Sequence, residues 1–171
     1  MRVRGFNLVE SLVIVAIVVA SAGIVVPIWA RRHTDTAHER VLTDLQRLAN
    51  GIQRYIHDTR SFPTGHTGAT SCHWLMTDGI HPTNNVFDSG PSMHVDRFLV
   101  ENGMAGAEWN GPYIDEEIGP DPWGRAYIVN VNGYFNSAER VIVLCAGPNG
   151  QVNTPVSATT AVGDDIMVVL D

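Results

Sequence analysis

The sequence predicts an α+β protein in which one long N-terminal helix is followed by a small antiparallel sheet. Apolar residues recur at helical spacing through the first third of the 171-residue chain. Short runs of β-branched and other apolar residues, separated by Gly, Pro and Asn, occupy its last third. A helical pattern followed by strand patterns is typical of an α+β domain, in which helix and sheet pack as two layers.

The N-terminus carries a long uncharged apolar run. Residues 12–30 are nineteen positions without Asp, Glu, Lys or Arg, and they follow Arg2, Arg4 and Glu10. A helix of that length spans about 28 Å, close to the hydrocarbon thickness of a bilayer. The run therefore predicts a membrane-spanning helix. Glu10 at its edge is predicted to be functional, because a carboxylate placed in lipid is costly.

A cleaved secretory signal is the alternative for this run. Ala20-Ser21-Ala22 offers an A-x-A cleavage site after a basic start and an apolar core. The apolar run continues for eight residues beyond that site, however, and Glu10 stands where the apolar core of a signal would begin. Both features favour a retained helix.

A second helical pattern follows. Between residues 34 and 60, apolar side chains recur every three or four positions while charged side chains occupy the other faces. We expect one long helix from about residue 6 to about residue 58, with its amphipathic second half packed on the sheet. Pro27 lacks a backbone donor and should kink this helix. The apolar stripe consists of Val41, Leu45, Leu48, Ile52 and Tyr55.

The rest of the chain predicts loops and three strands. Ser61-Phe62-Pro63 ends the helix, because the residue before a proline disfavours helical angles. Residues 65–111, rich in Gly, Pro and Asn, predict loops with a short helix, and Asp121-Pro122-Trp123-Gly124 predicts a turn. Strands are expected at 127–129, 141–144 and 166–170, with a long irregular loop at 146–163.

Several motifs resemble those of a known family. Arg4-Gly5-Phe6, followed by Glu10 and an apolar helix, is similar to the class III leader of type IV pilins and type II secretion pseudopilins. Residues 55–64 and 121–127 resemble the Y-x-x-D-x-G-x-Y-P-T and D-P-W-G-x-x-Y signatures of the major pseudopilin, with Arg60 and Phe62 in place of a Gly and a Tyr. The resemblance covers most of the chain outside about 65–110 and implies a pilin-like fold.

The resemblance also implies how the chain is processed and divided. A prepilin peptidase would cut after Gly5 and methylate the new N-terminal residue, Phe6, so that Glu10 becomes the fifth mature residue. Pro27 then occupies mature position 22, where many family members carry a proline. The expected segments are a leader at 1–5, a transmembrane and filament-core helix at 6–30, and a globular head at 31–171 that includes the amphipathic half of the helix.

The function that the resemblance implies is that of a structural subunit, polymerised through its N-terminal helix into a pilus or pseudopilus for type II protein secretion. Expected partners are further copies of the chain, the prepilin peptidase, the inner-membrane assembly platform, the minor pseudopilins and the membrane itself. The expected location is the bacterial inner membrane, as a single-pass protein with its head outside the cytoplasm, and then a periplasmic or extracellular filament.

Two alternatives stay open for that function. One is a surface-displayed type IV pilus subunit used for adhesion or motility; the D-P-W-G motif and the short C-terminal end favour the pseudopilin instead. The other is a membrane-anchored binding domain that never polymerises. Glu10 argues against the second alternative, because a lone anchor needs no carboxylate in its apolar helix.

Composition argues against other classes of protein. The chain has a net charge of −7 and no lysine, so it is a poor candidate for binding nucleic acid through phosphates. It contains no G-x-S-x-G, P-loop or G-x-G-x-x-G motif, and its seven histidines show no HExxH spacing, so no enzyme is predicted. A short acidic run at 115–117 predicts a solvated turn, and a binding site for a basic partner is the alternative.

The two cysteines, Cys72 and Cys145, are expected to lie in an oxidising compartment. We predict that they form a disulfide, which would close a loop of about seventy residues and stabilise the fold by roughly 4 kcal/mol. The alternative is two unpaired thiols, with Cys145 a small buried residue at a strand end.

Calcium is the one cofactor expected, and it too is implied by the resemblance. In the major pseudopilin family, the loop before the last strand binds calcium through acidic side chains and backbone carbonyls. Asn149, Asp164 and Asp165 are the candidate ligands here, with Asn149 replacing an Asp of the family; calcium accepts amide and carbonyl oxygens as well as carboxylates. The alternative is that Asp164 only caps the turn into the last strand.

Overall fold

The computed structural model describes residues 7–63, 72–84, 92–101 and 108–170, and within the first range it does not describe the side chains of 22–34. The predicted cleavage and methylation site, Gly5 and Phe6, lies outside these residues. The chain forms two compact units, one at 1–39 and the other at 40–171. Each unit is considered by itself.

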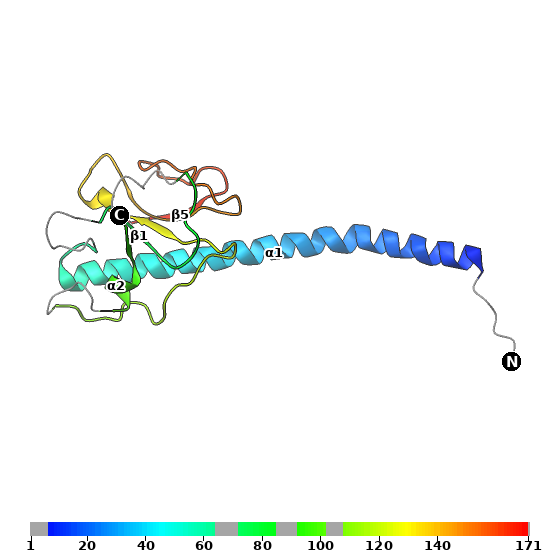
Figure 1. Ribbon diagram of the computed structural model, residues 1–171, viewed down its shortest axis with the longest axis horizontal. Coiled ribbons are helices and arrows are strands. Elements are labelled where there is room, and N and C mark those ends of the chain that lie inside the picture. The colour runs from blue at the N-terminus through cyan, green and yellow to red at the C-terminus, as the bar shows by residue number, and fades with distance from the viewer. Residues whose placement is uncertain (1–6, 64–71, 85–91, 102–107, 171) are drawn as a thin grey trace. The chain divides into compact units, whose positions relative to one another are not determined.

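Helix α1 (Leu8–Thr59) begins in the first unit and ends in the second (Figure 1). In the first unit its apolar side chains between Leu8 and Val19 are 46 to 78% exposed. Among the residues that the structure describes, no helix has both the length and the apolarity needed to cross a membrane. Pro27 lies within the assigned helix but among the side chains that are not described, and its kink stays a prediction.

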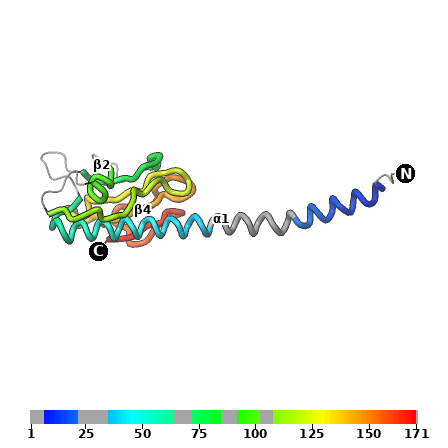
Figure 2. The backbone as a smooth tube through the Cα atoms, turned by 90° about the horizontal axis from the view of Figure 1, so that it is seen from below, coloured from blue at the N-terminus to red at the C-terminus, as the bar shows by residue number. Residues whose placement is uncertain are grey.

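In the second unit, the amphipathic part of α1 packs on the sheet. The five residues of the predicted stripe, from Val41 to Tyr55, are each at most 2% exposed. They share one core with Val129 and Val143 of the sheet, and Figure 2 shows this part of the helix running beside the strands. Apolar spacing of three and four residues places these side chains on one helix face, so the predicted stripe is confirmed.

The C-terminal end of α1 shows why the family signature has a glycine at the position that Arg60 occupies here. Arg60, which stands where the signature has Gly, adopts a left-handed backbone with φ 53°. Its N–H donates to the carbonyl of Ile56 at 3.0 Å, which closes the last turn of the helix. Such a C-terminal cap favours glycine because a Cβ is strained in that conformation.

The sheet has five strands in the order β2-β1-β3-β4-β5. Strands β3 (Ile128–Asn130), β4 (Val141–Cys145) and β5 (Ile166–Leu170) pair antiparallel and match the three predicted strands closely. Strands β1 (Trp74–Met76) and β2 (Ser92–His94) were expected as loop. Because β1 and β2 pair parallel, the prediction of a small antiparallel sheet is corrected to a five-stranded mixed sheet.

The segment after β2 holds the short helix that the sequence predicts between 65 and 111. Helix α2 (Asp96–Leu99) follows β2 and buries Phe98 and Leu99 in the core beneath α1. A single 3₁₀ turn, η1 (Asn132–Tyr134), follows β3. The Asn110 to Tyr113 region is tied to this layer, since the N–H of Tyr113 donates to the carbonyl of Leu99 at 2.7 Å.

The sheet is covered on both faces. One face meets α1, and the other holds a second core of Trp74, Ile128, Ile142 and Leu144 with Val152 from the terminal loop. This explains why 141–145 is a continuous apolar run rather than an alternating one, because both of its faces are buried. The loop at 146–163 therefore serves as a packing layer over the sheet.

Candidate functional site

Glu10 lies in the first turn of α1 and is exposed there. The positive end of the helix dipole favours a carboxylate at that position. Its neighbours one turn further along the helix, Val13 and Ile14, are exposed apolar residues. The carboxylate makes no ion pair with any residue that the structure describes. An exposed apolar helix surface with one acidic side chain has the chemistry of a surface that packs against another helix.

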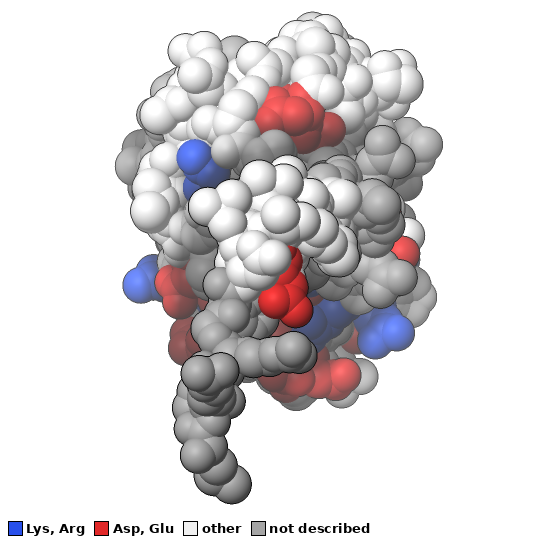
Figure 3. All heavy atoms as spheres, turned by 90° about the vertical axis from the view of Figure 1, so that its right-hand side faces the viewer, with Lys and Arg blue, Asp and Glu red and all other residues white. Residues whose placement is uncertain are grey.

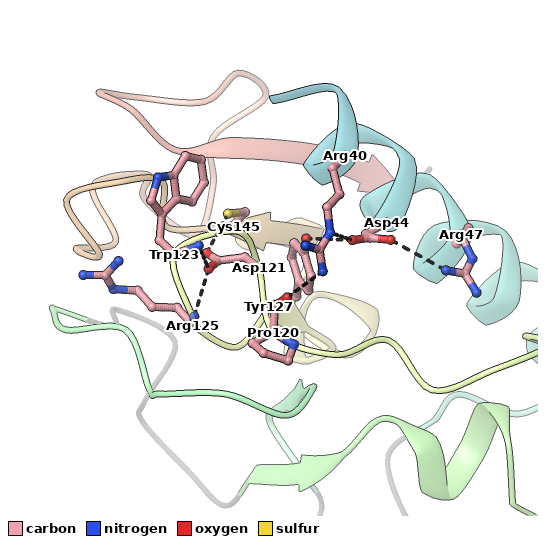
Figure 4. A network of polar contacts seen from close by, with 9 residues as sticks. All are labelled: Arg40, Asp44, Arg47, Pro120, Asp121, Trp123, Arg125, Tyr127 and Cys145. Atoms are coloured by element: carbon pink, nitrogen blue, oxygen red, sulfur yellow. Dashed lines mark hydrogen bonds and ion pairs between the residues drawn. The ribbon is translucent and has the colours of Figure 1, made fainter. Parts of the chain in front are cut away.

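The Asp-Pro-Trp-Gly turn forms as predicted. Asp121 is 4% exposed, and its Oδ1 accepts from the backbone N–H groups of Trp123 and Arg125, each at 2.8 Å. Gly124 takes φ 84°, which is favourable only for glycine. The other carboxylate oxygen accepts from the thiol of Cys145 at 3.2 Å, so the turn is fixed to the end of β4 (Figure 4).

A second buried carboxylate joins α1 to the sheet. The hydroxyl of Tyr127 donates to Oδ2 of Asp44 at 3.0 Å, and both residues are at least nine-tenths buried. Arg40 and Arg47 approach the same carboxylate at 3.7 and 3.6 Å, while Arg40 also donates to the carbonyl of Pro120 (Figure 4). Burial, and then the charge of Asp44, raises the pKa of Tyr127, so this hydroxyl remains a donor. Sequence reasoning missed this contact, since Asp44 looked like an ordinary polar-face residue.

The structure does not bring the two cysteines together. Both are free and buried; the thiol of Cys72 donates to the carbonyl of Trp74, whereas that of Cys145 donates to Asp121. Ile128 of β3 pairs with Met76 of β1 on one side and with Leu144 of β4 on the other, so Met76 and Leu144 lie opposite each other across the sheet. Strands β1 and β4 run in the same direction. Cys145 is one residue after Leu144, whereas Cys72 is four residues before Met76.

At about 3.3 Å per residue and about 4.8 Å per strand, this register separates the two cysteine Cα atoms by roughly 19 Å. A disulfide needs less than about 7 Å. The predicted Cys72–Cys145 bridge is therefore absent from the structure, and the alternative of two unpaired thiols applies to it.

The candidate calcium ligands do converge on the terminal loop. Asp164 accepts from the backbone N–H of Asn149 at 2.9 Å and from its side-chain amide. The Oδ1 of Asn149 accepts in turn from the N–H of Gln151 at 2.6 Å, and its amide also reaches Asn153. Gly147, with φ 59°, allows the approach, since a Cβ there would stand 2.2 Å from the carbonyl oxygen of Asp164.

Asp165 lies beneath this cluster. It is 6% exposed, and its Oδ2 accepts from the N–H groups of Asn153 and Thr154 at 2.8 and 2.7 Å. Its Oδ1 is buried and has no hydrogen-bond partner. A buried carboxylate oxygen without a donor is costly, because it has lost its water and gained nothing in return.

This donor set fits calcium in kind. It offers two carboxylates, amide oxygens and loop carbonyls, the hard oxygen ligands that calcium accepts, and the unpartnered oxygen of Asp165 would gain a positive partner. In the part of the chain that the structure describes, no three His, Cys, Asp or Glu side chains form a cluster arranged to hold a metal. A bound ion would thus rely mainly on backbone and amide oxygens. Among the described residues, the Asp164 carboxylate accepts its hydrogen bonds from Asn149, fifteen residues away in sequence, and not from the turn into the last strand. Calcium binding stays a prediction.

The face shown by Figure 3 carries acidic and basic side chains at scattered places on a largely uncharged surface, and several of opposite sign lie beside one another. Because the chain carries a net charge of −7, identical copies repel one another unless a patch of one sign meets a patch of the other.

Two comparisons with known proteins bear on this geometry. The family model described as "Type II secretion system (T2SS), protein G" matches residues 92–162, which include β2, the Asp-Pro-Trp-Gly turn, β3, β4 and most of the terminal loop. A curated relative, "Type II secretion system core protein G" of Escherichia coli (strain K12), is 24% identical over 151 residues, covering 88% of this chain and 86% of the relative. No solved structure gives a significant match. The resemblance to the major pseudopilin of type II secretion is confirmed.

Proposed function

From this similarity to the major pseudopilin of type II secretion systems, we propose that the chain is a structural subunit that polymerises through its N-terminal helix into a secretion pseudopilus. The role is mechanical rather than enzymatic. The relative is named as a core protein of the secretion system, and that name is carried over here as part of the proposal.

The observation that carries the proposal is the exposed apolar surface of α1. Between Leu8 and Val19, its large apolar side chains are about half exposed or more, far above what a soluble helix face tolerates without a partner. Burying apolar area stabilises by roughly 25 cal/mol per Å². Lipid would cover this surface before assembly, and the helices of neighbouring copies would cover it afterwards. When such a contact joins two different surfaces of identical subunits, it can repeat without closing and so gives an open filament.

Processing and charge control that assembly. The peptidase would remove residues 1–5 and leave an N-methylated amine at Phe6. Glu10 of one copy would then pair with that amine on a neighbour, which offsets the cost of removing both charges from water. The helix at 6–30 would hold the subunit in the bacterial inner membrane, where the assembly platform and minor pseudopilins act on it.

Calcium belongs to the same proposal. Asp164, Asp165 and Asn149 would hold the ion together with loop carbonyls, and the ion would supply charge neutralisation and internal order to a long loop that has little regular structure. The loop covers one face of the sheet through Val152 and Val156. Its order is thus coupled to the stability of the head.

The test replaces Glu10 in the full-length chain, produced in a bacterium with a type II secretion system that lacks its own major pseudopilin. Glu10→Leu and Glu10→Gln should leave the membrane level of the protein unchanged but lower the yield of sheared filaments, counted by electron microscopy, by at least roughly tenfold. Glu10→Asp, which keeps the charge, is the matched control and should assemble substantially better.

Secretion is the second readout of the same experiment. The wild-type chain should restore release of the host's secreted enzymes, and the Glu10→Leu variant should not. Filaments that form normally without the carboxylate would exclude Glu10 as the assembly residue. Surface filaments that form without any restored secretion would instead favour the alternative of a type IV pilus subunit.

A further inference from the structure

A separate acidic cleft lies on the head, away from the terminal loop. It has a volume of about 430 Å³. Among the residues that the structure describes, its lining includes four carboxylates, one arginine and one histidine, contributed by β2, α2 and the loops that flank them. The lining residues are Asp78, His94, Asp96, Arg97, Glu101 and Glu117.

His94 bridges two of these carboxylates. Its Nε2 is 3.1 Å from Oδ1 of Asp78, and its Nδ1 is 3.0 Å from Oδ2 of Asp96. A neutral imidazole can donate from only one ring nitrogen, whereas the imidazolium donates from both. With both carboxylates ionised, the two contacts can both be hydrogen bonds only if His94 is the imidazolium.

Even when His94 is charged, only one of the two carboxylate oxygens of Asp96 has a positively charged partner. It is 8% exposed, and its second oxygen, Oδ1, is buried without a hydrogen-bond partner. Burial raises the pKa of Asp96, the contact with His94 opposes that rise, and the charges of Glu117 and Asp78 add to it. Because Oδ1 is itself buried, a cation in the cleft would act on the Asp96 carboxylate as a whole, and such a cation would stabilise the ionised form of this poorly compensated group.

No cation within the described chain fills that place. Arg97 lines the cleft but makes no ion pair with any described residue. Even with His94 protonated and Arg97 counted, carboxylates are in excess. The cleft therefore attracts positive charge from outside.

The shape of the cleft favours a side chain over a metal ion. Among the described residues, no three acidic, His or Cys side chains are placed to hold a metal together. The cleft is also much larger than one ion needs, since a water molecule occupies about 30 Å³. A guanidinium has five donors in a flat fork and pairs with several carboxylates at once, so it matches both the volume and the charge.

We propose that this cleft receives an arginine side chain from a neighbouring copy of the chain. This inference rests on the proposed function, because a filament is what places a second copy beside the first. The heads of such a filament are acidic and repel one another, and a repeated arginine-to-cleft contact offsets that repulsion at every step. The contact joins two different surfaces, as a helical filament requires.

Among the arginines whose side chains the structure describes, three are candidates for this role. Each is exposed and makes no ion pair with any described residue, unlike Arg40 and Arg47, which approach Asp44. All three lie outside the cleft lining, on α1, at the end of α1 and before β4. They are Arg54, Arg60 and Arg140.

The test reverses charges at the rim of the cleft in the full-length chain. Glu117→Arg and Glu101→Arg should each lower filament yield by at least roughly tenfold, with an unchanged thermal unfolding midpoint in detergent. Glu116→Arg is the matched control, because it makes the same charge change one residue away and outside the cleft lining. It should assemble like wild type.

Rescue then identifies the partner. Each of Arg54→Glu, Arg60→Glu and Arg140→Glu is combined with Glu117→Arg, and we expect one combination to restore filaments. If Glu117→Arg assembles normally, or if none of the three combinations restores assembly, the inference is overturned.

Arg97→Gln tests the rival in which the cleft is neutralised within its own chain. This variant should assemble normally, and a loss equal to that of Glu117→Arg would assign the cation to Arg97 and overturn the inference. These outcomes can be told apart from a failure of the proposed function. A wild-type chain that never forms filaments would contradict the proposed function itself. Normal filaments from the cleft variants would contradict only the arginine-to-cleft contact.

Discussion

Asp44 is a single side chain that connects the two layers of the head. Asp44 is 9% exposed on α1, and its carboxylate accepts from the hydroxyl of Tyr127, the residue just before β3, and lies near two partly exposed arginines. The arginine contacts are long and solvent-screened, so they contribute little. The buried hydroxyl-to-carboxylate bond is the stronger part of this connection.

We predict that Tyr127→Phe destabilises the protein by about 1–3 kcal/mol, because the carboxylate stays buried after losing its donor. Asp44→Ala should cost a similar amount, since it leaves the Tyr127 hydroxyl buried and unpaired. A double-mutant cycle measured by urea unfolding checks the pairing. The double variant should be clearly more stable than the sum of the two single losses implies, by about 0.5–3 kcal/mol, and strict additivity would show that the bond is unimportant.

At Arg60 we predict a substitution that stabilises the protein, in contrast to the two at Tyr127 and Asp44. Arg60 holds φ 53° at the end of α1, a conformation that strains any residue with a Cβ by about 1–2 kcal/mol. Arg60→Gly should therefore raise stability by about 1 kcal/mol. Arg60→Ala is the control, because it removes the same charged side chain while keeping the strain. Equal unfolding midpoints for the glycine and alanine variants would contradict the prediction.

The terminal loop is the element most open to a ligand. We expect calcium at about 100 times its dissociation constant to raise the melting temperature of the full-length chain by about 5–10 °C, because an ion that binds only the folded state stabilises it by mass action. Asp165→Asn should abolish the rise while keeping an acceptor for the N–H groups of Asn153 and Thr154. Asp164→Ala should reduce it.

Asn149→Asp is the matched variant for that experiment. It replaces the amide that donates to Asp164 with a second carboxylate, so like charges meet when no cation is present. Melting in chelator should fall relative to wild type, and the rise on adding calcium should grow. Identical melting of the wild-type chain in calcium, magnesium and chelator would exclude the site.

The elements that the sequence predicted are those with a local signal. Strands β3, β4 and β5 are apolar runs bounded by turn residues, and α1 has a regular apolar stripe. Strands β1 and β2 have three residues each, and β2 reads Ser-Met-His, which is too short for its alternation to predict a strand. Their pairing depends on the position of β3, which is more than thirty residues away in sequence, and no local pattern can indicate it.

The candidate sites divide in the same way. Asn149 and Asp164, which the family resemblance named as the two ends of a calcium loop, are hydrogen-bonded to each other in the structure. The cysteine pairing depended on strand register, which places Cys72 and Cys145 at different levels of the sheet. The acidic cleft collects residues from three separated segments, and only Glu117 belonged to a visible acidic run.

At the scale of the whole molecule, the prediction concerns its N-terminus. The chain purified from a host with a prepilin peptidase should begin at Phe6 and carry one added methyl group, as measured by intact mass. Gly5→Leu should block processing, because a side chain hinders approach to the peptide bond, and should leave Met1 in place. A wild-type N-terminus at Met1 or at Gly23 would contradict the pilin-like leader.

The burial of both thiols has a practical consequence for labelling. Cys72 and Cys145 are at most 2% exposed, and burial raises the pKa of Cys72 to about 11 and that of Cys145 further still. Alkylating reagents react with the thiolate, which these sites disfavour at neutral pH. A cysteine introduced at an exposed position such as Arg54 or Glu116 would therefore be the fast-reacting thiol of the folded chain. Fluorophores and crosslinkers could then be attached there without first removing the native pair.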